Sequence, residues 1–258
     1  MTGRSGQART PHGAERANDS GADAATSRMK YDSQAIPREV IVVKHLRRNY
    51  SQYCGLAAAL DLIGERWTLL IIRELLTGPC RYNILLANLP GIGTNLLADR
   101  LKFLSQAGII RQRSQEGSKL RTYELTEQGE GLRESVLALA RWGLGTLDEP
   151  APGEIVRPRW AALAIEAMVA LGQAGPDEQY EFRIDDEVFH VAVHGGQVSV
   201  GHGKASEPSL TLTTDSLTFV KIGAGLLNPL EATLTNRLAM DGDEGAIIRC
   251  SRLLGLVR

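Results

Sequence analysis

Apolar positions recur at helical spacing between residues 93 and 106. Leu97, Leu101 and Leu104 fall on one stripe of a helix, the kind of face that a protein core buries. Polar residues, among them Asn95 and Lys102, are left on the other face. Because a helix of this length is marginal in water by itself, the leucine stripe must be held by packing. The polar face is therefore expected to be presented outwards.

The segments around this helix also have periodic patterns. Two helices are expected over residues 54–63 and 65–77, and a third over residues 82–89. Downstream, two alternating segments flank a hairpin whose tip carries Lys119 and Arg121. A winged helix-turn-helix has three helices followed by a basic hairpin, and the last of the three helices enters the major groove of DNA. The helices over residues 65–77, 82–89 and 93–106, with this hairpin, fit that order.

A longer helix is expected over residues 127–147, with Thr126 as its N-cap. An apolar stripe along it extends beyond what a small three-helix core requires. The stripe predicts a dimer seam, and packing against a neighbouring domain is an equally open alternative. It consists of Leu132, Val136, Leu139 and Ala140.

The pattern changes after residue 147. Residues 148–158 carry three prolines and are interpreted as a linker. Residues 159–258 then begin with a helical period, continue with alternating strands and close with amphipathic helices. We expect an antiparallel meander with helices packed on one face, which gives this half an α+β fold.

The N-terminal stretch has a different composition. Residues 1–30 contain no Leu, Ile, Val, Phe, Tyr or Trp, so they cannot bury enough apolar surface to offset the entropy lost on ordering. We assign residues 1–35 to a disordered tail. The winged domain is then expected over residues 36–147.

Charge is unevenly distributed, although the formal net charge of the chain is only −1. Residues 38–147 carry 15 Lys and Arg against 10 Asp and Glu, a net charge of +5. Residues 148–258 carry 9 against 16, a net charge of −7. The basic part is therefore the candidate for contact with phosphate.

The number and spacing of the cysteines and of other reactive residues argue against several classes of protein. The three cysteines have neither the number nor the spacing of a disulfide framework or a zinc site. No phosphate loop, nucleophile elbow or metal-ligand spacing is present, so we expect no enzyme, no cofactor and no metal. There is no apolar run of about 20 residues and no secretion signal, so a cytoplasmic protein without a membrane partner is expected.

Three segments together resemble the HxlR-type family of bacterial winged-helix regulators: CGLAAALDLIGERWTLLIIRELLTGP, LPGIGTNLLADRLKFLSQAGII and YELTEQG. The resemblance covers about residues 50–147. It implies a homodimer that places two recognition helices on a pseudo-palindromic operator in double-stranded DNA. Base reading is then expected near the helix start, at Thr94 and Asn95. The other expected DNA contacts are Arg100, Lys102, Lys119 and Arg121.

Cys54 opens the first helix, at the position where some HxlR-type proteins carry a redox-sensing thiol. A helix N-terminus lowers the pKa of a thiol and so favours the reactive thiolate. The alternative is a small buried residue of the first helix. We favour the alternative, because a second domain offers another route for sensing.

The C-terminal half resembles the sterol-carrier-protein-like domain, most clearly in LTLTTDSLTFVKIGAG and NPLEATLTNRLAMDGD. The resemblance implies that an apolar molecule is held between sheet and helices. Each of the expected lining residues is equally explained as ordinary core. They are Phe182, Phe189, Phe219, Ile222 and Leu226.

The expected function is therefore a DNA-binding transcriptional regulator, a repressor, whose C-terminal domain binds an apolar or amphipathic effector that modulates operator binding. One alternative is a regulator switched by oxidants or electrophiles at Cys54. Another is a lipid or acyl carrier whose winged domain serves protein contacts.

Overall fold

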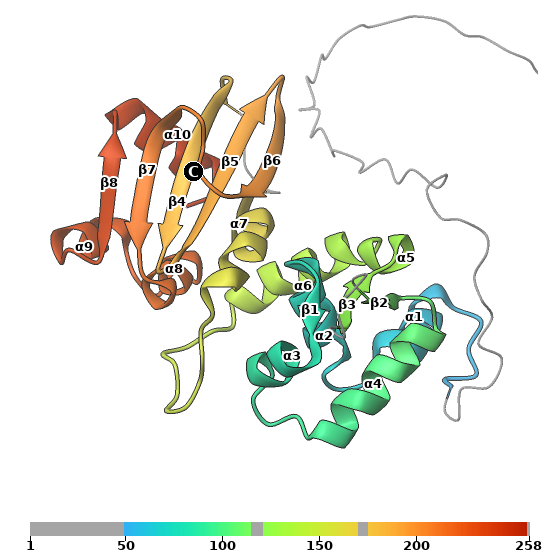
Figure 1. Cartoon of the computed structure of the whole chain (residues 1–258). Helices are drawn as coiled ribbons and strands as arrows, with labels where there is room; N and C mark the ends of the chain where they lie inside the picture. The colour runs from blue at the N-terminus through green and yellow to red at the C-terminus, as the bar shows by residue number, and fades with distance from the viewer. Residues whose placement is uncertain (1–48, 115–120, 170–174, 257–258) are drawn as a thin grey trace, which may run out of the picture. The chain divides into compact units, whose positions relative to one another are not determined.

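The computed structural model describes residues 49–114, 121–169 and 175–256 (Figure 1). The expected tail, residues 1–35, lies outside these ranges. The described residues contain one hydrophobic core in the N-terminal half and another in the C-terminal half, with a small satellite cluster beside the second. None of the helices within the described ranges is both long enough and apolar enough to cross a membrane.

The N-terminal half is a set of helices around a small antiparallel sheet with strand order β1-β3-β2. Its elements are α1 (Gly55–Ile63), α2 (Thr68–Leu76), β1 (Cys80–Arg81), α3 (Tyr82–Asn88), α4 (Thr94–Gln106), β2 (Ile110–Ser114), β3 (Arg121–Leu125), α5 (Glu127–Glu130) and α6 (Arg133–Leu144). The three expected helices, the organising helix and the hairpin are all present. The winged helix-turn-helix prediction is confirmed.

Helix α2 begins three residues later than expected because the chain turns sharply at Trp67. This residue has a φ of 77°, in the left-handed region that a bulky side chain rarely adopts. Its indole packs against the N-terminal core, close to Gly91, where an added Cβ would lie 3.7 Å from the ring. The turn is thus set by where the ring must pack, which helical periodicity does not report.

The helix expected over residues 127–147 is interrupted and ends earlier. Thr126 does cap its start, since its Oγ1 accepts a hydrogen bond from the N–H of Gly129 at 3.2 Å. Gly129 lies so close to the backbone of Ile109 that a Cβ would come within 2.2 Å of that residue's carbonyl oxygen. The chain therefore makes one tight turn, α5, against the base of the wing before α6 starts in a new direction.

The C-terminal half has one five-stranded sheet, order β6-β5-β4-β7-β8, with helices packed against it. Its elements are η1 (Pro158–Trp160), α7 (Ala161–Val169), β4 (Glu178–Ile184), β5 (Glu187–His194), β6 (Gln197–His202), β7 (Pro208–Thr214), α8 (Ser216–Gly223), α9 (Pro229–Leu234), β8 (Leu238–Gly242) and α10 (Glu244–Leu253). The α+β fold is confirmed.

One pairing departs from the expected meander. Strand β7 does not continue beside β6 but pairs with β4, in parallel, while the other neighbours are antiparallel. The loop between β6 and β7 is tied to β4: the N–H of Ala205 donates to Glu181 Oε2 and that of Ser206 to Gln179 Oε1, each at 3.0 Å. These side chains guide the chain across β4 to its free edge.

The helices of this half start where their sequence indicates. Asp215, Asn228 and Asp243 precede α8, α9 and α10, and each side chain accepts a hydrogen bond from a backbone N–H of the first turn. Pro229 is the first residue of α9, a position where its missing N–H costs nothing.

Candidate nucleic-acid interface and ligand cavity

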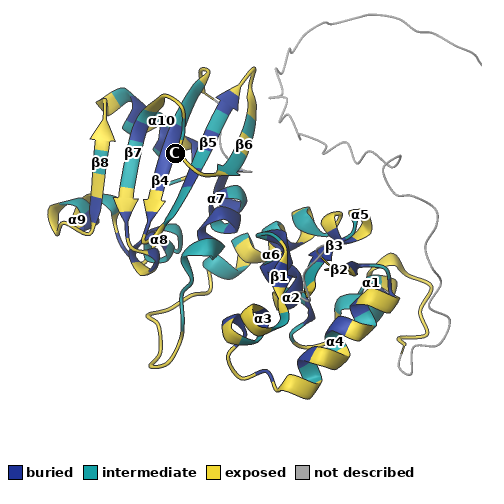
Figure 2. Ribbon diagram, in the orientation of Figure 1, coloured by how far each residue is buried: buried dark blue, intermediate teal, exposed yellow. Residues whose placement is uncertain are grey.

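Helix α4 has the two faces that the sequence predicts. Leu97, Leu101 and Leu104 are at most 1% exposed and belong to the N-terminal core. The opposite face is exposed along the helix, as the alternation of buried and exposed stripes in Figure 2 shows. Packing thus fixes the helix while leaving its polar face free for a partner.

The start of α4 is exposed and held in place. Thr94 and Asn95 are both exposed, and the carbonyl of Thr94 accepts a hydrogen bond from the Tyr82 hydroxyl at 2.8 Å. Gly93 is the N-cap and contributes no side-chain cap. The first-turn N–H groups, which form the positive end of the helix dipole, therefore have no intramolecular cap from that residue.

The basic residues of α4 differ in availability. Lys102 is exposed. Arg100 instead donates to Glu65 at 2.9 Å, with its side chain only 21% exposed. A phosphate contact from Arg100 would require this ion pair to open.

The wing carries two arginines in addition to the basic residues expected at its tip. Lys119 lies outside the described residues, and Arg121 is exposed at the start of β3. Arg111 and Arg113 on β2 are also well exposed, and both pair with Glu124, at 2.6 and 3.5 Å. The hydrogen bond from Arg111 is the main cause that lowers the pKa of Glu124. These two arginines were not among the DNA contacts expected from the sequence, although their alternate spacing in IIRQRS places them on one side of a strand.

The C-terminal half contains an apolar cavity of about 40 Å³ between sheet and helices. Phe182, Phe219 and Ile222 line it, as expected. Phe189 does not: it is fully buried, with its ring centroid 5.0 Å from that of His202. Leu226 is 39% exposed and lies outside the cavity.

Other walls of the cavity were not anticipated from the sequence. They come from α7, β7, β8, α10 and the residues after α10, and none of the described residues that line the cavity is charged. The amphipathic period of the last helix is the sequence feature that could have identified those on α10. These other lining residues include Met168, Leu212, Met240, Cys250 and Leu254.

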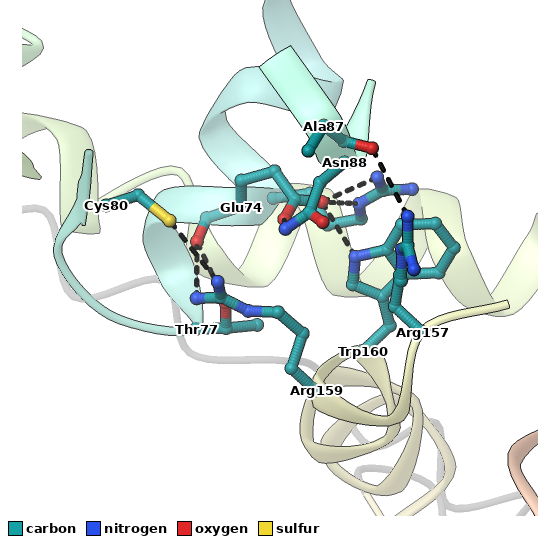
Figure 3. Close-up of polar contacts among 9 residues, drawn as sticks. Glu74, Thr77, Cys80, Ala87, Asn88, Arg157, Arg159 and Trp160 are labelled. Atoms are coloured by element: carbon teal, nitrogen blue, oxygen red, sulfur yellow. Dashed lines mark hydrogen bonds and ion pairs between the residues drawn. The ribbon is translucent and has the colours of Figure 1, made fainter. Parts of the chain in front are cut away.

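A polar cluster joins the residues after the linker to the N-terminal helices (Figure 3). Its centre is the carboxylate of Glu74, whose side chain is fully buried. That carboxylate accepts hydrogen bonds from Arg73 at 2.7 Å, from Asn88 at 2.9 Å and from the indole N–H of Trp160 at 2.7 Å. We call these four residues the Glu74 cluster.

Comparison with known proteins agrees with this geometry. Residues 62–150 match the HxlR-like helix-turn-helix family. The HTH-type transcriptional regulator YodB of Bacillus subtilis (strain 168) is 34% identical over 86 residues, which cover 33% of this chain and 77% of YodB. The chain belongs to the HxlR-like helix-turn-helix family. In this HxlR-like protein, residues 174–255 match a second family, the SCP-2 sterol transfer family.

Other relatives match the same part of the HxlR-like chain. The HTH-type transcriptional regulator Rv3095 of Mycobacterium tuberculosis (strain ATCC 25618 / H37Rv) is 40% identical over 93 residues, covering 36% of this chain. Those residues span 58% of the mycobacterial protein, less than two thirds of its length. Among solved structures, quinone-bound YodB from B. subtilis has a TM-score of 0.30 at 33% identity, covering 34% of this chain and 93% of that one.

Cys54 of the HxlR-like domain is exposed, so the expectation of a buried residue in the first helix is wrong. It is the N-cap of α1, with an extended backbone. The backbone N–H groups of Ala57 and Leu56, in the first turn of α1, lower the pKa of its thiol. Cys80 and Cys250 are buried, and burial raises the pKa of the Cys250 thiol to about 12.

Proposed function

We propose that this protein is a DNA-binding transcriptional regulator, acting as a repressor, and that its C-terminal domain binds an apolar effector that weakens operator binding. The observation that carries the first part is α4: its leucines are buried, its first turn is exposed, and an arginine-bearing wing follows it. Membership of a family of helix-turn-helix regulators supports the same assignment.

The roles within this interface follow from side-chain chemistry. Asn95 is suited to adenine, because its amide both donates and accepts in one plane, and Thr94 lies beside it. Lys102, Lys119 and Arg121 are assigned to phosphate, which fixes the position on DNA but carries no sequence information. Arg100 is assigned to phosphate as well, once its ion pair with Glu65 opens.

Asn95→Ala is expected to lower affinity for the operator by about 1 to 3 kcal/mol and to relax sequence preference at one base pair. Lys102→Ala should instead weaken binding to all sequences and reduce the salt slope by about one. The operator is first obtained by capturing genomic fragments with the full chain, and affinities are then measured by fluorescence anisotropy. Gln106→Ala, at the far end of the same exposed face, is the control. An unchanged sequence preference in Asn95→Ala would contradict the assigned base contact, and capture of no specific fragment would contradict the function.

We assign the homodimer contact to apolar side chains left exposed on α1 and α6. Leu56 and Leu60 are 69% and 38% exposed on α1, and Leu139 is 51% exposed on α6. The stripe predicted along α6 divides: Val136 enters the core, while Leu139 and its neighbour Ala140 remain at the surface. Large apolar side chains left exposed on a helix are candidates for a surface that a partner covers.

Leu139→Asp is expected to give a monomer of 28.0 kDa by light scattering, where the parent protein gives twice that mass. A charge in an apolar interface remains without a partner, which disfavours association. Binding to two half-sites, about 34–36 Å or a multiple of this apart, should weaken with it. Leu234→Asp, at a 75% exposed position on α9, should leave the mass unchanged. A parent protein that is already a monomer at binding concentrations would refute the assignment.

The effector class follows from the cavity. Since the described residues that line it are uncharged and mostly apolar, the part of a ligand that enters must be apolar and any charged group must stay outside. The cavity of about 40 Å³ has room for little more than one water molecule. Binding of an apolar ligand therefore requires the walls of the cavity to move apart, and this movement would change the conformation of the C-terminal half.

The exposure of Cys54 favours one second candidate, a regulator switched at this thiol. A lowered pKa increases the thiolate fraction, and the thiolate is the reactive form. Cys54→Ser distinguishes the two: loss of the response to a quinone, with the response to an apolar ligand retained, assigns the switch to the thiol.

A further inference from the structure

Residues at the end of the linker and directly after it bind the C-terminal ends of two helices in the N-terminal half. Arg159 donates to Thr77 Oγ1 at 2.6 and 2.9 Å and to the carbonyl of Glu74 at 3.4 Å, at the end of α2. Arg157 donates to the carbonyl of Ala87, at the end of α3, at 3.3 Å. The last carbonyls of a helix lack intrahelical partners and carry partial negative charge, so each guanidinium complements a helix end.

The buried side chain of Glu74 also links the residues after the linker to α2 and α3. Its buried carboxylate accepts two hydrogen bonds from Arg73 on its own helix, one from Asn88, the last residue of α3, and one from Trp160 in η1. The Arg73 guanidinium also lies 3.9 Å from the centre of the Trp160 ring. A buried carboxylate needs all its hydrogen bonds, because in a low dielectric an unmet bond is costly. Trp160 and Asn88 thus donate to the two oxygens of one carboxylate, which links η1 to the end of α3.

The end of α3 matters because α4 follows it closely. Asn88 is separated from the first residue of α4, Thr94, by a short turn that contains Pro90 and Gly91. Tyr82, at the start of α3, also holds the carbonyl of Thr94. A change in where α3 ends is thus transmitted to the exposed start of α4.

Helix α7 carries the connection towards the cavity. It begins directly after Trp160 and contributes to both cores: Leu163 to the N-terminal one, Ile165 and Met168 to the C-terminal one. Met168 also lines the apolar cavity. A ligand that pushes on Met168 therefore acts on the helix whose first residues follow the Glu74 cluster.

We infer that Trp160 is a positioning residue for the DNA-binding unit: its hydrogen bond to Glu74 fixes the end of α3, and through α7 it makes that position depend on whether the cavity is filled. The second part rests on the proposed function, whereas the first does not. The competing route is an opening of the cavity at α10, which lines it through Ile247 and Cys250 and would leave α7 in place.

Trp160→Phe in the full chain tests the positioning role without any ligand. The substitution removes the N–H donor but keeps an aromatic ring beside Arg73. Amide hydrogen exchange in α3 and the first turn of α4 is expected to become about tenfold faster, as for loss of one hydrogen bond to a charged group, while the C-terminal sheet is unchanged. Trp142→Phe makes the same chemical change at a 73% exposed position and should alter neither region. Unchanged exchange in α3 of Trp160→Phe overturns the positioning role.

A second measurement tests transmission, with the fluorescent fatty acid cis-parinaric acid as the probe. In the parent protein, saturating probe is expected to raise the operator Kd by about 5- to 150-fold. In Trp160→Phe the probe should bind within twofold of the parent affinity, yet raise the operator Kd by less than twofold. A full response in Trp160→Phe overturns transmission through α7 and supports opening at α10. A parent protein that binds the probe with no change in operator Kd contradicts the effector proposal, while faster exchange in Trp160→Phe would still support the positioning role.

Discussion

Glu74→Ala is expected to destabilise the N-terminal half by about 3 to 5 kcal/mol. The substitution removes the acceptor shared by Arg73, Asn88 and Trp160, and it leaves the Arg73 guanidinium without its carboxylate. Burial already lowers the pKa of Arg73, and its interaction with Glu74 opposes this shift. Taking away one partner of a buried pair costs more than the pair itself contributes, because the other charge stays desolvated.

The measurement is urea unfolding followed by tryptophan fluorescence. Trp67, Trp142 and Trp160 all precede α7, so the signal reports the N-terminal half and the Glu74 cluster. Glu134→Ala, at an exposed position on α6, is the matched control and should change stability by no more than about 0.5 kcal/mol. Should Glu74→Ala unfold at the urea concentration of the parent, the Glu74 cluster does not stabilise this half.

Leu212→Trp is expected to abolish the operator response to cis-parinaric acid and to weaken binding of the probe at least tenfold. Leu212 lies on β7 and lines the apolar cavity, which at about 40 Å³ is smaller than the indole that would enter it. Filling the cavity should cost about 1 to 3 kcal/mol in stability through overpacking. Because the indole would occupy the cavity as the probe does, operator affinity without the probe should fall towards that of the probe-bound parent.

Thr213→Trp provides the control on the same strand. Its side chain points to the opposite face of the sheet, is exposed and does not line the cavity, so the probe should bind and act as in the parent. Probe titrations by fluorescence and operator titrations by anisotropy give both quantities. If Leu212→Trp still releases the operator on addition of probe, the apolar cavity is not the effector site, and Cys54 becomes the residue to test.

The local pattern of the sequence determined where most elements lie. The leucine spacing of α4 is a property of one helix, and the structure buries the leucines that the spacing selects. Asp215 and Asp243 cap the helices that directly follow them, which requires nothing beyond the next few residues. Fold class and family followed from the same short-range signals.

Tertiary structure decided the features that depend on residues far apart in the chain. The left-handed turn at Trp67 places its ring in the N-terminal core, beside Gly91, and the turn before α6 requires that Gly129 lies against the backbone of Ile109. The parallel β4–β7 pair could not be predicted either, since alternation marks a strand but not its neighbour.

The candidate sites divide in the same way. Exposure of Thr94 and Asn95 followed from helical phase, whereas the ion pair of Arg100 with Glu65, 35 residues away, did not. Trp160 and Glu74 are 86 residues apart, and each taken alone has the pattern of ordinary core or surface. Sequence determines which faces can be buried, because burial follows local periodicity. Which buried groups meet is decided only when the chain is packed, because a hydrogen bond between distant residues leaves no periodic trace in either segment.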